Sequence, residues 1–222
     1  AADGPRSRIA AATGLPPQSL AAAAQVEMVL DRPHAWAEVH LAAEFTLGYG
    51  WLIPAGERAR VGVGLGGTGA TLAAARALLI KFVERLRALE RIRRLPPIAY
   101  SQGWIPVDGL RASPVEGVLL AGDAAGCAHP LSGAGVQAAL VSGRLAGKAA
   151  AEALHAGDLA PLAGYEAQLR AAIGSPIARA QAARARLAAA WLGEPIGLSR
   201  LLREYWFTFS SPAPPNTPTA SP

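Results

Sequence analysis

The chain has 222 residues, of which 51% are hydrophobic and 17% are charged, and this balance excludes an intrinsically disordered protein. Its formal net charge of +5 permits contact with phosphates or an anionic membrane, but too few aromatic residues lie among the basic ones to indicate a nucleic-acid interface. The single cysteine, Cys127, excludes an internal disulfide, and the cysteine and histidine spacings predict no metal site. Neither a signal peptide nor a membrane span is recognisable, so we expect a cytoplasmic protein, with peripheral contact at the inner face of the membrane as an option.

The first 25 residues read as a loop with a short helix over 7–13 that Gly14 and two prolines end. Four segments with alternating apolar and polar residues then predict strands, at 26–32, 36–42, 48–56 and 59–65. The last two form a predicted hairpin with its turn at 55–57. Because short consecutive strands usually pair antiparallel, we expect an antiparallel sheet.

A long helix is predicted over 70–94, and a strand over 98–107 returns to the sheet. Between positions 76 and 94, seven Lys and Arg residues stand against two acidic ones. Two interpretations of this basic helix stay open: a solvated face, or a face that approaches an anionic membrane or a lipid diphosphate.

The continuous apolar segment at 117–122, GVLLAG, predicts a strand that is buried on both faces of a parallel sheet. A helix over 133–155 follows, ended by Gly157. The region 161–209 is predicted to be helical, and 210–222 to be a disordered tail. Pro176 and Pro195 are expected to interrupt the helical region.

Asp123 directly follows the predicted buried strand, at the place where ligands of open α/β sheets bind. A carboxylate there can accept hydrogen bonds from sugar or ribityl hydroxyls. Residues 130–135, PLSGAG, lead into a helix whose first N–H groups favour an electron-rich ligand edge. Small residues recur every fourth position, at Gly135, Ala139, Gly143, Gly147 and Ala151. From the residues alone, a cofactor site and a packed helix with Asp123 capping a turn are both open.

Residues 122–147, GDAAGCAHPLSGAGVQAALVSGRLAG, resemble the C-terminal flavin motif of FAD-dependent oxidoreductases of the glutathione-reductase-like and p-hydroxybenzoate hydroxylase-like class. ADGPRS at 2–7 and GYGWLIPAG at 48–56 resemble two further segments of the geranylgeranyl reductases, in the same chain order. The resemblance covers about residues 1–155 and implies FAD as the cofactor. The cofactor-binding residues that it implies are Asp3, Gly4, Ser7, Gly122, Asp123, Pro130, Gly133, Ala134 and Gly135. The substrate-side residues that it implies are Tyr49, Trp51 and Pro54.

The same resemblance implies an α/β (α+β) fold, in which a partial FAD-binding Rossmann-like domain carries an inserted antiparallel substrate-domain sheet and a helical C-terminus. The implied division is 1–25 and 107–158 for the FAD domain, 26–106 for the substrate domain, 159–209 for C-terminal helices and 210–222 for the tail. The implied reaction is hydride transfer from reduced flavin to an isoprenoid C=C bond, with NAD(P)H or ferredoxin as external donor. No catalytic residue is identified, because His129 and Cys127 are better interpreted as packing residues.

Two departures from the family pattern keep other functions open. The segment YGWLIP also approaches the WxWxIP motif of flavin-dependent halogenases, with Tyr49 in place of the first Trp, so a monooxygenase or halogenase is the alternative. Family members begin with a strand–GxGxxG–helix unit, and none precedes Ala1, so we expect the C-terminal part of an enzyme or an inactive fragment that binds no flavin. GLGGTG at 64–69 has a similar pattern, but we expect it in a hairpin and not at a pyrophosphate.

Overall fold

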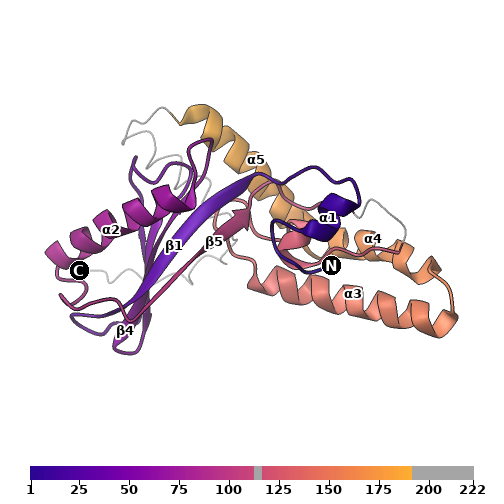
Figure 1. Cartoon of the computed structure of the whole chain (residues 1–222), viewed down its shortest axis with the longest axis horizontal. Helices are drawn as coiled ribbons and strands as arrows, with labels where there is room; N and C mark the ends of the chain where they lie inside the picture. Colours follow the sequence, from indigo (N-terminus) through magenta and orange to yellow (C-terminus); the bar gives the residue numbers. More distant parts are fainter. Residues whose placement is uncertain (113–116, 192–222) are drawn as a thin grey trace, which may run out of the picture.

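Two halves make up the computed structural model, which describes residues 1–112 and 117–191 (Figure 1). One half is an antiparallel sheet with helix α2 (Leu72–Ala88) on one face. The other half is mainly helical and contains α1 (Arg8–Ala12), α3 (Val136–Ala156), α4 (Tyr165–Leu169) and α5 (Ser175–Ala190). This confirms the predicted fold class, with helices beside an antiparallel sheet.

The sheet has five strands in the order β2-β3-β4-β1-β5, and every neighbouring pair is antiparallel. The strands are β1 (Leu20–Val29), β2 (Glu38–His40), β3 (Gly50–Ala55), β4 (Arg58–Leu65) and β5 (Ala99–Pro106). The predicted hairpin is confirmed: Gly56 and Glu57 join β3 to β4, and the φ of Gly56 is 67°. Such a turn favours glycine because other residues are strained at positive φ.

The central strand β1 begins six residues before the predicted start at position 26. The prediction was wrong because alanines fill the first part of the strand, and alanine has a weak preference for strands. Pairing overrides this preference, since Ala22 lies opposite Leu65 of β4 on one side and Trp104 of β5 on the other.

The core of the sheet half lies between the sheet and α2. Thr71 caps this helix by accepting a hydrogen bond from the Ala74 amide at 3.0 Å. The rings of Phe45 and Phe82 meet edge to face in this core, with centroids 5.5 Å apart. The helix ends at Ala88, earlier than the predicted 94. It cannot continue as predicted, because Glu90 has a φ of 53° and Ile92 is buried in a bridge to Leu30.

The apolar segment at 117–122 is not a strand, so that prediction was wrong. Ala121 is extended, and Ala1 forms backbone hydrogen bonds with this segment, whereas the Leu120 carbonyl accepts from the Tyr165 hydroxyl and the Gly122 amide donates to the Ser142 hydroxyl. The N-terminal ammonium of Ala1 donates to the carbonyl of Leu119 at 2.5 Å, and the Ala121 amide donates to the carbonyl of Ala1 at 2.9 Å. One residue of pairing is too little for a ladder.

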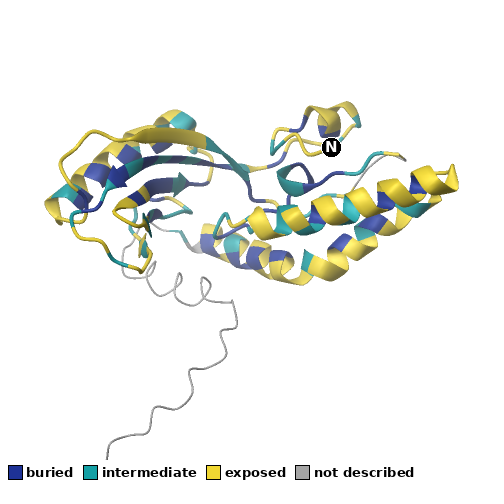
Figure 2. Cartoon of the chain, turned by 90° about the horizontal axis from the view of Figure 1, so that it is seen from below, coloured by how far each residue is buried: buried dark blue, intermediate teal, exposed yellow. Residues whose placement is uncertain are grey.

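Helix α3 begins at Val136 instead of the predicted Gly133. The φ of Gly133 is 68°, in the left-handed region, which excludes this residue from a right-handed helix. The predicted end is confirmed, because Gly157 caps the helix with a φ of 71°. Figure 2 shows long exposed stretches along the helices of this half. Three large apolar side chains of α3 are exposed: Val136, Leu140 and Leu154.

The C-terminal region is helical as predicted as far as Ala190, and residues 192–209 of it lie outside the described part of the chain; Pro176 does not interrupt it. A π-helical turn at Arg170–Gly174 joins α4 to α5, and Pro176 is an early residue of α5. The wider turn and the early position accommodate a residue that lacks an amide hydrogen. Pro195 and the predicted tail at 210–222 lie outside the described residues.

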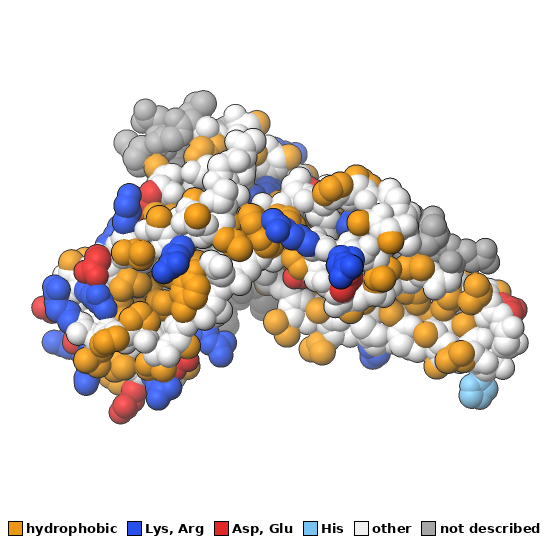
Figure 3. Space-filling model, in the orientation of Figure 1, with side chains coloured by type: hydrophobic (Ala, Val, Ile, Leu, Met, Phe, Trp, Pro, Cys, Tyr) orange, Lys and Arg blue, Asp and Glu red, His pale blue; other side chains and the backbone are white. Residues whose placement is uncertain are grey.

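The surface carries both apolar and basic side chains, and Figure 3 shows them interspersed over the sheet half. Within the part of the chain that the structure describes, no helix has the length and apolar character that crossing a membrane requires.

Candidate functional site

The N-terminal residues Asp3, Gly4 and Ser7 form the turn that starts α1. The Ser7 hydroxyl accepts a hydrogen bond from the Ala10 amide at 2.9 Å, and the Asp3 carboxylate accepts one from the Arg8 amide at 2.8 Å. The hydrogen bond from Ser7, together with backbone amides, lowers the pKa of Asp3. This carboxylate is therefore committed to local capping, and these three residues remain predicted cofactor ligands that no contact here tests.

The carboxyl group of Asp123 differs from that of Asp3 in the direction of its pKa shift. Asp123 lies in the short 3₁₀ turn Gly122–Ala125, where burial raises the pKa of its carboxyl. Within residues 1–112 and 117–191, no donor bonds to the carboxylate oxygens, although the backbone carbonyl of Asp123 accepts from Gln18 at 3.0 Å. A half-buried carboxylate without a donor is costly, and a ligand that carries hydroxyl groups would relieve that cost.

The loop from His129 to Gly135 lies beside this carboxylate. A Cβ atom on Gly135 would lie 3.6 Å from Oδ1 of Asp123, so the glycine keeps the approach to the carboxylate open. No side chain caps the first amides of α3, which follows at Val136. The loop is held from within, because the His129 ring accepts the Ser132 amide at 3.2 Å on Nδ1, and burial lowers the pKa of that ring.

The predicted substrate-side residue Tyr49 contacts this loop directly. Its hydroxyl donates to the carbonyl of Ser132 at 2.6 Å, and burial raises the pKa of this hydroxyl. Trp51 lies beside Tyr49, with ring centroids 5.6 Å apart. The structure therefore brings the two sequence motifs, 83 residues apart, to one place.

Trp51 lies across the face of the sheet opposite α2. A Cβ atom on Gly62 would come within 2.2 Å of the Trp51 ring, so this position must be glycine for the indole to lie flat. Pro54 points the other way, because residues alternate along β3 and its partner Ala59 is in the core under α2. The structure thus groups Tyr49 with Trp51 but not with Pro54.

We expect Tyr49→Phe to lower the free energy of unfolding by about 1 kcal/mol, because it removes one hydrogen bond to a carbonyl that is partly buried. Urea unfolding followed by circular dichroism measures this. Tyr100→Phe is the matched control, since that exposed hydroxyl bonds only to its neighbour Gln102. Equal losses in both variants would contradict a specific role for the bond between Tyr49 and Ser132.

Arg184 of α5 is a site residue that the sequence did not reveal. Its partly buried guanidinium donates to the carbonyls of Leu47 at 3.2 Å and Pro130 at 3.1 Å, and burial lowers its pKa. A Cβ atom on Gly66 would come within 2.1 Å of the guanidinium, so a larger residue there would displace the end of the Arg184 side chain. Nothing in the local sequence distinguishes Arg184 from the other arginines of this alanine-rich helix, because the distinction depends on contacts with residues 47, 66 and 130.

The arrangement fits the riboflavin half of FAD, which consists of the ring and the ribityl chain. The Asp123 carboxylate suits the hydroxyls of a ribityl chain, and the uncapped amides at the start of α3 suit an electron-rich ring edge. Glycine at position 135 keeps the approach to the Asp123 carboxylate open, whereas a Cβ atom on Gly133 would meet the Ile105 side chain at 3.2 Å. Among the described residues, no group of three or more His, Cys, Asp or Glu side chains is arranged to hold a metal ion.

Curated relatives share a substantial part of the sequence, although no protein-family model matches the chain. The chain is 40% identical over 171 residues to digeranylgeranylglycerophospholipid reductase 1 of Methanopyrus kandleri. This alignment covers 71% of this chain and 44% of that protein. It is 34% identical over 189 residues to digeranylgeranylglycerophospholipid reductase 2 of Methanothermobacter thermautotrophicus, covering 81% and 47%. The chain thus spans less than half the length of these relatives.

Solved structures share the fold. A geranylgeranyl bacteriochlorophyll reductase-like protein from Thermoplasma acidophilum superposes with a TM-score of 0.75 at 22% identity, over 92% of this chain and 58% of that one. PqsL from Pseudomonas aeruginosa, described as "a probable FAD-dependent monooxygenase", gives a TM-score of 0.56 at 19% identity, over 91% of this chain and 58% of that one. At these identities the likeness concerns the fold alone.

Proposed function

Since the chain is a relative of the digeranylgeranylglycerophospholipid reductases of the geranylgeranyl reductase family, we propose that it supplies the ring and substrate side of an FAD-dependent oxidoreductase. The proposed reaction reduces a C=C bond of an isoprenoid lipid. The hydrogen bond from Tyr49 to Ser132 carries the proposal, because it joins the aromatic face of the sheet to the loop beside Asp123.

On the cofactor side, Asp123 would hold the ribityl chain by accepting hydrogen bonds from its hydroxyls. The amides at Gly135 and Val136 would face the electron-rich edge of the ring. FAD supplies hydride chemistry when it is bound. The residues of this chain would orient the ring, and Gly135 keeps the approach to Asp123 open.

On the substrate side, Tyr49 and Trp51 offer an aromatic surface next to the same loop, on the face of the sheet opposite α2. Trp51 lies over Gly62, and Tyr49 closes the surface towards Ser132. An isoprenoid chain is apolar, so its burial here would exclude water from the reacting carbons. The relatives are named for the reduction of a geranylgeranyl lipid, which supports this class of substrate.

A flavin-dependent monooxygenase is the second candidate, because monooxygenase-type structures share the fold. Oxygen separates the two: a reductase reduces its substrate without oxygen, whereas a monooxygenase consumes NAD(P)H only when oxygen is present. The electron donor and the contact between the basic helix α2 and a membrane stay predictions from the sequence.

Flavin titration tests the proposal on the 222-residue chain. We expect riboflavin, FMN and FAD to bind with dissociation constants within about threefold of one another, because the candidate contacts are all to the ribityl chain and the ring. Quenching of flavin fluorescence measures this. A folded chain that binds none of the three flavins would overturn the proposal.

A further inference from the structure

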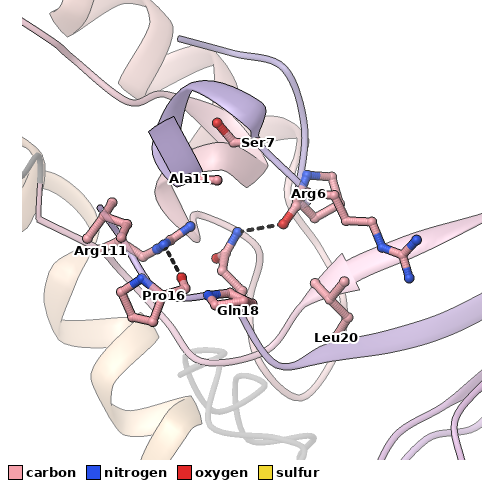
Figure 4. Close-up of a pocket in the computed structure, with 10 residues that line it drawn as sticks. Arg6, Ser7, Ala11, Pro16, Gln18, Leu20 and Arg111 are labelled. Carbon is pink, nitrogen blue, oxygen red and sulfur yellow. Dashed lines mark hydrogen bonds between the residues drawn. The ribbon is translucent and has the colours of Figure 1, made fainter. Parts of the chain in front are cut away.

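A cavity of about 440 Å³ lies between the N-terminal turn and the start of β1, and Ser7 is the one residue it shares with those predicted to bind the flavin. Figure 4 shows Arg6 and Arg111 on opposite sides of Gln18 in its wall. The described lining residues are Pro5, Arg6, Ser7, Ala11, Leu15, Pro16, Pro17, Gln18, Leu20 and Arg111. This set contains two guanidinium groups and no carboxylate.

The Arg6 side chain is held without using its hydrogen-bond donors. Its guanidinium carbon lies 4.4 Å from the centroid of the Trp104 ring. Stacking of this kind uses the flat face of the guanidinium and leaves the N–H groups at its edge available. Within the described part of the chain, Arg6 makes no ion pair and no side-chain hydrogen bond.

The Arg111 side chain is anchored on the opposite side. One terminal nitrogen donates to the carbonyl of Pro16 at 2.5 Å, and no described carboxylate pairs with the guanidinium. The adjacent cavity of about 540 Å³ is different, because it contains Asp108 near Arg184, and Arg184 already donates to two carbonyls. Of the two cavities, the one lined by Arg6 and Arg111, which we call the Arg6 cavity, therefore has the excess of unpaired positive charge.

Two contacts connect this cavity with the candidate flavin site. The Gln18 amide nitrogen donates both to the carbonyl of Pro5 and to the carbonyl of Asp123, each at 3.0 Å. Gln18 therefore lies between the cavity and the turn that carries Asp123.

We propose that the Arg6 cavity binds the phosphate or diphosphate group of a molecule that reacts at the adjacent site. Guanidinium groups recognise phosphate oxygens through paired N–H donors, and two of them around one cavity without a carboxylate favour a multiply charged anion. The phosphate has two sources that fit: a dinucleotide reductant or the head of an isoprenoid lipid. The identity of the ligand rests on the proposed function, whereas binding of the phosphate group does not.

Calorimetric titration of the full chain with inorganic pyrophosphate tests the site without any flavin. We expect binding to weaken about tenfold or more in Arg6→Gln and in Arg111→Gln, because each loses charge-assisted hydrogen bonds. Arg93→Gln is the matched control, an exposed arginine beyond the end of α2 that removes the same charge. Arg111→Lys keeps the charge, and circular dichroism identifies any variant that fails to fold.

Selective weakening in the two cavity variants supports the site, and lack of binding by the parent chain overturns it, as does equal weakening in the control. Two competitors then identify the source. Displacement of pyrophosphate by NADPH assigns a dinucleotide, and displacement by farnesyl diphosphate assigns a lipid head. If pyrophosphate binds and neither competitor displaces it, the cavity does not serve the reaction. If pyrophosphate binds but riboflavin does not, the proposed function fails while the phosphate site stands.

Discussion

Asp123→Asn should weaken riboflavin binding about tenfold to a hundredfold while it stabilises the flavin-free chain. The loss of affinity follows because asparagine offers a neutral acceptor in place of a charged one to the ribityl hydroxyls. The gain in stability follows because the carboxylate is half-buried and has no donor among the described residues. Fluorescence titration and urea unfolding at pH 7 measure the two effects.

The gain in stability of Asp123→Asn should depend on pH, and the direction of this dependence follows from the pKa shift of Asp123. Burial raises the pKa of Asp123 above its ordinary value of 3.8, so the folded chain holds this proton more tightly than the unfolded chain does. Stability from this group is therefore full below pH 3.8 and is lost as the pH rises through the folded pKa. The stability advantage of Asp123→Asn should accordingly be present at pH 7 and disappear towards pH 3.

An exposed aspartate provides the control for both measurements. Among the described residues, the Asp31 carboxylate, in the turn that follows β1, pairs only with the exposed Arg32, at 3.9 Å, and 39% of the Asp31 side chain is exposed. Asp31→Asn should change neither flavin affinity nor the pH profile appreciably. Loss of stability at pH 7 in Asp123→Asn would mean that the carboxylate has a partner within the chain, and would count against its assignment to a ligand.

Gly126→Ala should cost about 3 kcal/mol or more of the free energy of unfolding. Gly126 ends the turn that carries Asp123, with a φ of 70°, and an added Cβ would come within 2.0 Å of the Gly109 carbonyl oxygen. Both atoms belong to backbone that cannot rotate aside, so one of the two segments must move. The displaced turn should also weaken flavin binding. Urea unfolding and flavin titration measure the two losses.

Gly157→Ala separates the backbone clash from the strain of the left-handed conformation. Gly157 has a φ of 71°, and no atom lies within 4 Å of the position that its Cβ would take. This variant should lose about 1 kcal/mol, the cost of placing alanine in the left-handed region. Similar losses at the two positions would show that the contact with Gly109 is relieved at little cost.

The sequence was sufficient for most of the sheet. Alternation of apolar residues identified β3 and β4, and Gly56 marked the turn between them. The local sequence pattern was misleading for segments in which hydrogen bonds to neighbouring segments decide whether a strand forms. The alanine run that starts β1 becomes a strand because two neighbouring strands flank it. GVLLAG does not, because the side chains of Tyr165 and Ser142 take backbone hydrogen bonds of this segment.

The candidate site was predictable in part for the same reason. Sequence motifs pointed to Asp123 and Tyr49, and the structure places both of them around one loop. Arg184 and Gln18 were missed, because a lone arginine or glutamine carries no local pattern. Pro54 was grouped with Trp51 by its motif, although the alternation of β3 sends it to the other face.

The hydrogen bonds that close the site have a consequence for how the chain folds. Tyr49 and Ser132 are 83 residues apart, Gln18 and Asp123 are 105 apart, and Arg184 and Leu47 are 137 apart. Such distant contacts repay their loop-closure entropy only after the intervening chain is ordered. The hairpin β3–β4 and helix α2 are local and can form early. The site is therefore assembled last, and a ligand bound there acts on the final step of folding.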